Sequence, residues 1–152
     1  SFNLAFTTIS SGGFIPTANL SNIIETKFQT FVLSITLLFP ILNFFLIHDV
    51  ITRQFSLRKN QEDLHLASLI ISLTLIIYFF VIPNEDFANV LFAITSSIST
   101  SGITTYTPKV DLSLFFILLS VVGGSLISTS SGFKYTRIYI QFLQIIYLIF
   151  HQ

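Results

Sequence analysis

The chain has 152 residues, of which 52% are hydrophobic and only 9% are charged, and its mean hydropathy is +0.81. A soluble domain usually carries roughly 25% charged residues, so this composition indicates a membrane protein. The formal net charge is zero, which argues against binding to nucleic acid. The sequence contains no cysteine, which excludes disulfides and thiolate metal sites, and no methionine, so we interpret it as part of a longer protein.

Two apolar segments have the length of membrane-spanning helices. Phe28–Ile47 is twenty residues without a charge, and Leu64–Ile82 is nineteen uncharged residues if His65 is neutral. About 20 residues are needed to cross a bilayer as a helix. Pro40 is tolerable in the first segment if a neighbouring group satisfies the freed carbonyl, and it is expected to bend the helix.

The loop between these segments predicts their orientation. It contains Arg53, Arg58 and Lys59, and the positive-inside tendency places such a loop in the cytoplasm. The first helix then runs inward and the second runs outward, which makes Ile82–Asp86 an external turn. Because Pro108–Asp111 is also polar, we expect Phe87–Thr107 to enter the membrane and return to the same side. Irregular backbone at membrane depth is tolerated only when buried in protein or lining a watery cavity.

The last segment, Leu112–Phe150, is too long to cross the bilayer as one helix. Its thirty-nine residues would span about 58 Å at 1.5 Å per residue, against a hydrocarbon core of about 30 Å. The sequence "GGSLISTSSGF", Gly123–Phe133, is rich in glycine and hydroxyl residues. We therefore predict that the helix breaks there.

The strongest internal signal is a repeated glycine-centred loop. A shift of 89 residues places Ile9–Phe14 on Ile98–Ile103, and each copy precedes a long apolar stretch. Rings of backbone carbonyls from such loops replace the hydration shell of a monovalent cation in channel filters, and glycine permits the backbone angles that aim them. A single loop of this kind is more typical of close helix packing, but the duplication at fixed spacing favours the ion-filter interpretation.

The pattern resembles the potassium-uptake superfamily of Trk, Ktr and HKT transporters, especially the TrkH-type membrane subunit. "AFTTISSGGFIPTANLS" is similar to its second pore loop and "FAITSSISTSGITTYTP" to its third. "VGGSLISTSSGFKYTRI" resembles the family segment GGCAGST-GG-K--RI in the second helix of repeat three. The resemblance covers essentially the whole chain. It departs from the family in this last segment, where Leu126, Ile127, Ser130 and Ser131 replace glycines.

The resemblance implies an all-α polytopic membrane protein built from repeated helix–pore loop–helix units. Residues 1–48 would be the pore loop and second helix of repeat two, 49–63 a cytoplasmic loop, and 64–150 repeat three. The implied potassium filter residues are Ser10, Ser11, Gly12, Gly13, Ser99, Thr100, Ser101 and Gly102. The implied gating loop, below the filter, contains Ser125, Ser128, Thr129, Ser130, Ser131, Gly132 and Lys134.

The implied function is potassium uptake across a bacterial inner membrane, with potassium as the transported substrate, no cofactor and no enzymatic activity. The expected partners are the lipid bilayer, the remaining repeats of the same polypeptide, a second copy in a homodimer and a cytoplasmic nucleotide-binding regulatory subunit. The alternative is a non-conducting structural or assembly subunit whose Gly/Ser segments only pack helices.

Lys134 is the charged residue singled out by its position beside an apolar run at membrane depth. We expect it to place a positive charge near the ion path and to help hold the gate. The alternative is that its side chain extends to the cytoplasmic interface. The sequence "SGFK", Ser131–Lys134, also matches the S-x-x-K pattern of some Ser–Lys nucleophiles, but so short a match with no partner groups is weak support for a hydrolase.

Overall fold

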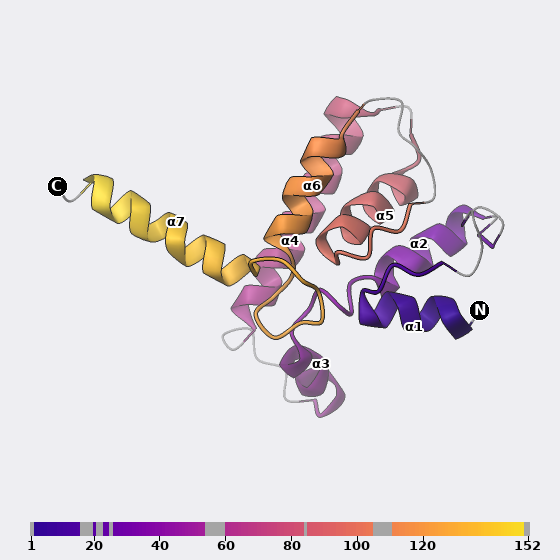
Figure 1. Ribbon diagram of the computed structural model, residues 1–152, viewed down its shortest axis with the longest axis horizontal. Coiled ribbons are helices and arrows are strands. Elements are labelled where there is room, and N and C mark those ends of the chain that lie inside the picture. Colours follow the sequence, from indigo (N-terminus) through magenta and orange to yellow (C-terminus); the bar gives the residue numbers. More distant parts are fainter. Residues whose placement is uncertain are drawn as a thin grey trace.

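The computed structural model describes residues 2–15, 20, 23–24, 26–53, 60–83, 85–104 and 111–150. Within these residues the regular elements are all helical (Figure 1). In chain order they are α1 (Phe2–Ser10), α2 (Lys27–Thr36), α3 (Phe44–Ile51), α4 (Gln61–Ile76), the π-helical segment η2 (Ile77–Val81), α5 (Phe87–Ile98), α6 (Ser113–Val122) and α7 (Tyr135–Phe150). The all-α part of the predicted fold class is therefore confirmed.

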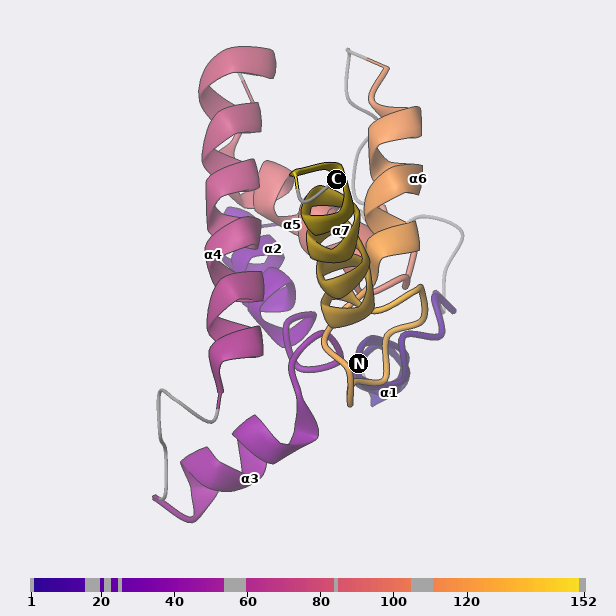
Figure 2. The same ribbon diagram turned by 90° about the vertical axis from the view of Figure 1, so that its left-hand side faces the viewer.

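Helix α5 lies at the centre of the fold and packs against α2, α4 and α6. Val90, Ile94 and Ile98 recur every four residues, so they share one face, which packs into a core formed with α4 and α6. Phe92 faces a second core that contains Leu4 of α1 and residues of α2. In Figure 2, where α4 and α6 are separated, α5 lies behind α7 and between them. Burial on several sides thus fixes the short helix that precedes the second glycine loop.

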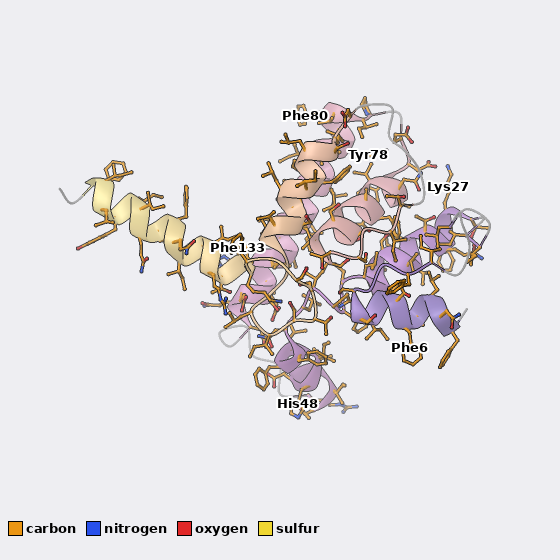
Figure 3. The ribbon with its side chains drawn as sticks, viewed as in Figure 1. Phe6, Lys27, His48, Tyr78, Phe80 and Phe133 are labelled. Carbon is orange, nitrogen blue, oxygen red and sulfur yellow. The ribbon has the colours of Figure 1, made fainter. Side chains whose placement is uncertain are left out.

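Helix α4 continues into η2 without interruption and confirms the helix expected over Leu64–Ile82. The combined helix, Gln61–Val81, has 21 residues and is the one helix among the described residues that is long and apolar enough to cross a membrane. Its length is about 31 Å at 1.5 Å per residue. One face packs on α5 through Leu66 and Ile70, whereas Phe79 and Phe80 are exposed, and Phe80 lies at the periphery in Figure 3.

The single helix expected over Phe28–Ile47 is wrong. Helix α2 ends at Thr36, the chain turns, and α3 begins at Phe44. Pro40 has no N–H to continue the helix, and the turn is stabilised because the carbonyls of Pro40 and Ile41 accept hydrogen bonds from Ser130 and Ser125 of a distant loop. Asn43 then caps α3, its side-chain oxygen accepting from the Phe45 N–H at 3.0 Å.

The break predicted within Leu112–Phe150 is confirmed. Helix α6 ends at Val122, Gly123 adopts φ +68°, and α7 begins only at Tyr135. Residues 123–134, which we call the break loop, fold back beside the end of α1 (Figure 1). Helix α7 projects away from the other helices in the same view, and none of its described residues is buried.

Helices α2 and α5 begin on the same side of the molecule. Lys27 in the first turn of α2 pairs with Asp86, which precedes α5, at 2.7 Å, and Lys27 is labelled near this end in Figure 3. A capping box between Thr26 and Gln29 starts α2. The chain reverses after η2, and α5 packs beside α2. Two of the three basic residues used to predict orientation, Arg58 and Lys59, lie outside the described residues.

Helix α6 begins next to an exposed carboxylate. Asp111 Oδ1 accepts hydrogen bonds from the N–H of Ser113 at 3.0 Å and from its hydroxyl at 2.5 Å. These bonds stabilise the charged form, so they lower the pKa of Asp111. The aspartate therefore satisfies an N–H group at the start of the helix.

Candidate functional site: two glycine loops and the break loop

The two predicted filter loops share one pattern of positive φ angles. Each follows the end of a short helix, α1 in the first copy and α5 in the second. The left-handed region is occupied at Ser11 (φ 54°) and Gly13 (φ 69°), and again at Thr100 (φ 59°) and Gly102 (φ 63°). These positions correspond under the 89-residue shift. A β-branched residue such as Thr100 rarely adopts positive φ. The two copies therefore share an energetically unfavourable backbone angle as well as similar residue types.

One hydrogen bond is also repeated. The hydroxyl of Thr7 donates to the carbonyl of Phe14 at 2.7 Å, and the hydroxyl of Ser96 donates to the carbonyl of Ile103 at 2.6 Å. Both pairs join a residue in the last turns of the short helix to the residue after the filter glycine. The hydroxyl side chains therefore hold each returning segment against its own helix.

Three buried serines hold the second loop from behind. The Ser99 hydroxyl lies 3.0 Å from both the Ser96 carbonyl oxygen and the Ser101 hydroxyl, and the Ser96 and Ser101 hydroxyls are 3.2 Å apart. Among the described residues, hydrogen bonds of the two loops end on flanking carbonyls, and none ends on a carbonyl of residues 11–13 or 100–102. The hydroxyls thus bond within the scaffold. Of the other predicted filter carbonyls, that of Ser99 accepts the Thr100 hydroxyl at 2.6 Å.

The two loops contact each other at one glycine but not at the other. A Cβ atom added to Gly13 would collide with the backbone carbonyl oxygen of Ser101, so the loops approach closely there. A Cβ added to Gly102 would have no described atom within 4 Å. Gly13 is therefore required for the contact between the loops, whereas Gly102 borders open space.

The break loop touches both glycine loops. The N–H of Ser131 donates to the Thr100 hydroxyl oxygen at 3.1 Å, and the Thr129 hydroxyl donates to the carbonyl of Ile9 at 3.1 Å. Under the 89-residue shift Ile9 corresponds to Ile98, two residues before Thr100. The loop is thus placed at the start of each filter segment.

The break loop is also built against the turn that follows α2. Ser125 N–H donates to the Ile41 carbonyl at 2.9 Å, Ser130 N–H donates to the Pro40 carbonyl at 3.0 Å, and Phe44 N–H donates to the Ile127 carbonyl at 3.0 Å. Ser125 and Ser130 are buried, and the Ser130 hydroxyl accepts from the Gly124 N–H at 2.9 Å. The breaks in the two long apolar segments therefore stabilise each other.

Lys134 closes the break loop on itself. Its ammonium donates to the carbonyl and the hydroxyl of Ser128, each at 3.1 Å, and to the carbonyl of Ser130. Its backbone has φ +72°, which an L side chain rarely adopts. Gly132, also at positive φ (94°), lies against the carbonyls of Ser120 and Val121, where a Cβ would be only 2.9 Å from each oxygen. Lys134 is half-buried, and its contacts are those of a residue that shapes the loop.

Sequence reasoning missed two carboxylates beside the break loop. Glu62 accepts hydrogen bonds from Leu126 and Thr136, and Asp63, which is buried, accepts one from the Asn43 N–H at 2.9 Å. The available signal was the position of two consecutive acids at the start of an apolar helix, where the helix dipole favours negative charge. Comparisons of the chain with protein families, with curated proteins and with solved structures give no match.

Proposed function

We propose that the chain forms part of a potassium-uptake protein of the Trk, Ktr and HKT type and supplies two of four filter loops. The observation that carries the proposal is the repeated loop geometry, with positive φ at Ser11 and Gly13 and at Thr100 and Gly102. An accident of local packing gives no reason for positive φ to recur at the same two positions 89 residues apart, in each copy with one non-glycine residue. A shared requirement to aim successive carbonyls at one ion does give such a reason.

The chemistry of the loops suits a weakly held monovalent cation. A dehydrated cation must find several oxygen ligands, but full opposite charges would hold it too tightly for conduction. The carbonyls of residues 11–13 and 100–102 are uncharged oxygen ligands, and no described hydrogen bond ends on them. Helices α1 and α5 end at these loops, so the negative ends of their dipoles favour a cation there.

A polytopic membrane architecture accounts for the apolar surface. Exposed large hydrophobic side chains cover α6 and α7 as well as the outer face of α4, including Leu114, Ile117, Phe142 and Phe150. Contiguous apolar surface of this extent marks contact with protein or lipid. We infer that α4 and η2 span the bilayer, that α5 re-enters it, and that the interrupted pairs α2–α3 and α6–α7 cross it as broken helices.

The break loop is the proposed gate. It contacts Ile9 and Thr100 at the beginning of the two filter segments, and a segment in that place lies across the path of an ion leaving the filter. The remaining two filter loops, the second copy in a homodimer and the nucleotide-binding regulatory subunit belong to this proposal, as does a bacterial inner-membrane location.

The alternative, a subunit whose small residues only pack helices, is favoured by the crowding at other glycines. A Cβ at Gly124 would lie 2.6 Å from the carbonyl oxygen of Ile41, and one at Gly123 would collide with that of Ser131. Such close backbone contacts are typical of structural glycines. Gly102 distinguishes the two functions, because it borders open space and still adopts positive φ.

The direct test is growth and rubidium uptake in bacteria that lack their own potassium-uptake systems, with the full-length polypeptide that contains this chain. The proposal predicts restored growth at low external potassium and rubidium uptake that potassium inhibits better than sodium. A protein that reaches the membrane intact and gives neither result contradicts it.

A further inference from the structure

Two consecutive carboxylates at the start of α4 hold the two helix breaks. A single oxygen of Glu62, Oε1, accepts the N–H of Leu126 at 2.7 Å and also the hydroxyl of Thr136. Asp63 Oδ1 accepts the N–H of Asn43 at 2.9 Å. Asn43 ends the α2–α3 turn, so the neighbouring side chains of one helix end bind both breaks.

Glu62 bonds to both ends of the break loop. Leu126 lies near the beginning of the loop, and Thr136 is the second residue of α7, immediately after it. One carboxylate oxygen therefore ties the first half of the break loop to the first turn of α7. Hydrogen bonds to a charged acceptor are roughly twice as strong as neutral ones, so this contact contributes more than an ordinary bond within the loop.

We propose that Glu62 is a positioning residue that holds the break loop in place against the two glycine loops. Opening of the loop then requires Leu126 and Thr136 to leave the Glu62 carboxylate, so the start of α4 helps to set the proportion of molecules in which the loop is released. The description of the loop as a gate rests on the proposed function, but the position of the loop can be measured without a transport assay.

The experiment uses a thiol as a reporter of loop position. The chain contains no cysteine, and Ser125 is fully buried within the break loop, so Ser125→Cys introduces the chain's one thiol with little change in size. Its rate of reaction with a water-soluble maleimide is measured in the full-length protein, with any cysteine outside these 152 residues replaced by serine. The reporter is used alone and combined with Glu62→Ala, Glu62→Gln or Thr136→Val. Gln61→Ala is the matched control, because Gln61 is the adjacent residue and its side chain is exposed.

The expected result is graded. Glu62→Ala removes the acceptor and raises the alkylation rate roughly tenfold, because labelling follows the population of the released loop and charged hydrogen bonds are the strongest of their kind. Glu62→Gln keeps an acceptor oxygen without the charge and raises the rate about threefold, and Thr136→Val, which leaves the Leu126 bond, also gives an intermediate rate. Gln61→Ala leaves the rate unchanged.

Two results overturn the role of Glu62. One is an alkylation rate in Glu62→Ala equal to that of Ser125→Cys alone, and the other is an equal rise in every variant, including Gln61→Ala. Rubidium uptake by the same proteins separates this role from the proposed function. Graded labelling without any rubidium uptake supports the positioning role and contradicts the proposed transport function. Rubidium uptake with a labelling rate that does not depend on Glu62 supports transport and contradicts the positioning role.

Discussion

Replacing Gly13 and Gly102 separately with alanine distinguishes a filter from a packing motif, because the two glycines are matched in backbone and differ in surroundings. Both adopt left-handed φ, at 69° and 63°. At Gly13 the added methyl group would collide with the Ser101 carbonyl oxygen, whereas at Gly102 it would meet no described atom within 4 Å. The pair therefore separates backbone strain from crowding.

The expected costs follow from these surroundings. Placing an L residue in the left-handed region costs about 1–2 kcal/mol, which is the whole expected loss of stability for Gly102→Ala. Gly13→Ala carries the same strain, and the overlap with Ser101 adds about 1–3 kcal/mol of the kind seen in overpacked cores. We expect a total near 2–5 kcal/mol for that variant, together with a displacement of the second loop.

Two quantities are measured for each full-length variant. One is the free energy of unfolding of the purified protein in detergent, and the other is the ratio of the potassium and sodium concentrations that halve rubidium uptake. The filter account predicts that Gly102→Ala alters ion selectivity despite its modest loss of stability. The packing account predicts a loss of stability with unchanged selectivity. Equal destabilisation by both substitutions, with selectivity preserved in Gly102→Ala, would refute the reasoning from loop geometry.

Four further substitutions test other contacts. Lys134→Gln removes an ammonium that binds three acceptors within the break loop, and we expect altered rubidium flux; unchanged uptake and gating would show that the lysine is not needed there. Ser96→Ala and Thr7→Val each remove one equivalent hydroxyl-to-carbonyl bond and should each lower the free energy of unfolding by about 1 kcal/mol, whereas a loss in one variant alone contradicts structural equivalence of the loops. Lys27→Ala breaks an exposed ion pair with Asp86 and should change stability by less than about 1 kcal/mol, as followed by denaturation at low and high salt.

The sequence predicts those features that depend on local pattern and length. The repeat of Ile9–Phe14 at Ile98–Ile103 is visible as residue types, and its backbone conformation follows because glycine at positions 13 and 102 tolerates positive φ. The break after Val122 is predictable because a helix over Leu112–Phe150 would be nearly twice the bilayer thickness. Both features can be recognised from residue types and segment length, without knowledge of which residues meet in space.

Features that depend on distant partners are not predictable in this way. The turn at Pro40 and Ile41 lies within a long uncharged segment, and its carbonyls are satisfied by Ser125 and Ser130, more than eighty residues away. Hydropathy records the segment as one helix because it contains no information about these partners. Glu62 similarly enters a charge count as one acid in the loop expected to be cytoplasmic, although its contacts in the fold are with the break loop and the start of α7.

The measurement that tests the central claim most directly is the position of bound cations in the full-length protein. Thallium or rubidium, both close substitutes for potassium, would be located by anomalous scattering from crystals. The account predicts anomalous density within ligand distance of the carbonyl oxygens of residues 11–13 and 100–102, above the break loop. Anomalous density absent from these carbonyls in a protein that takes up rubidium would contradict the account.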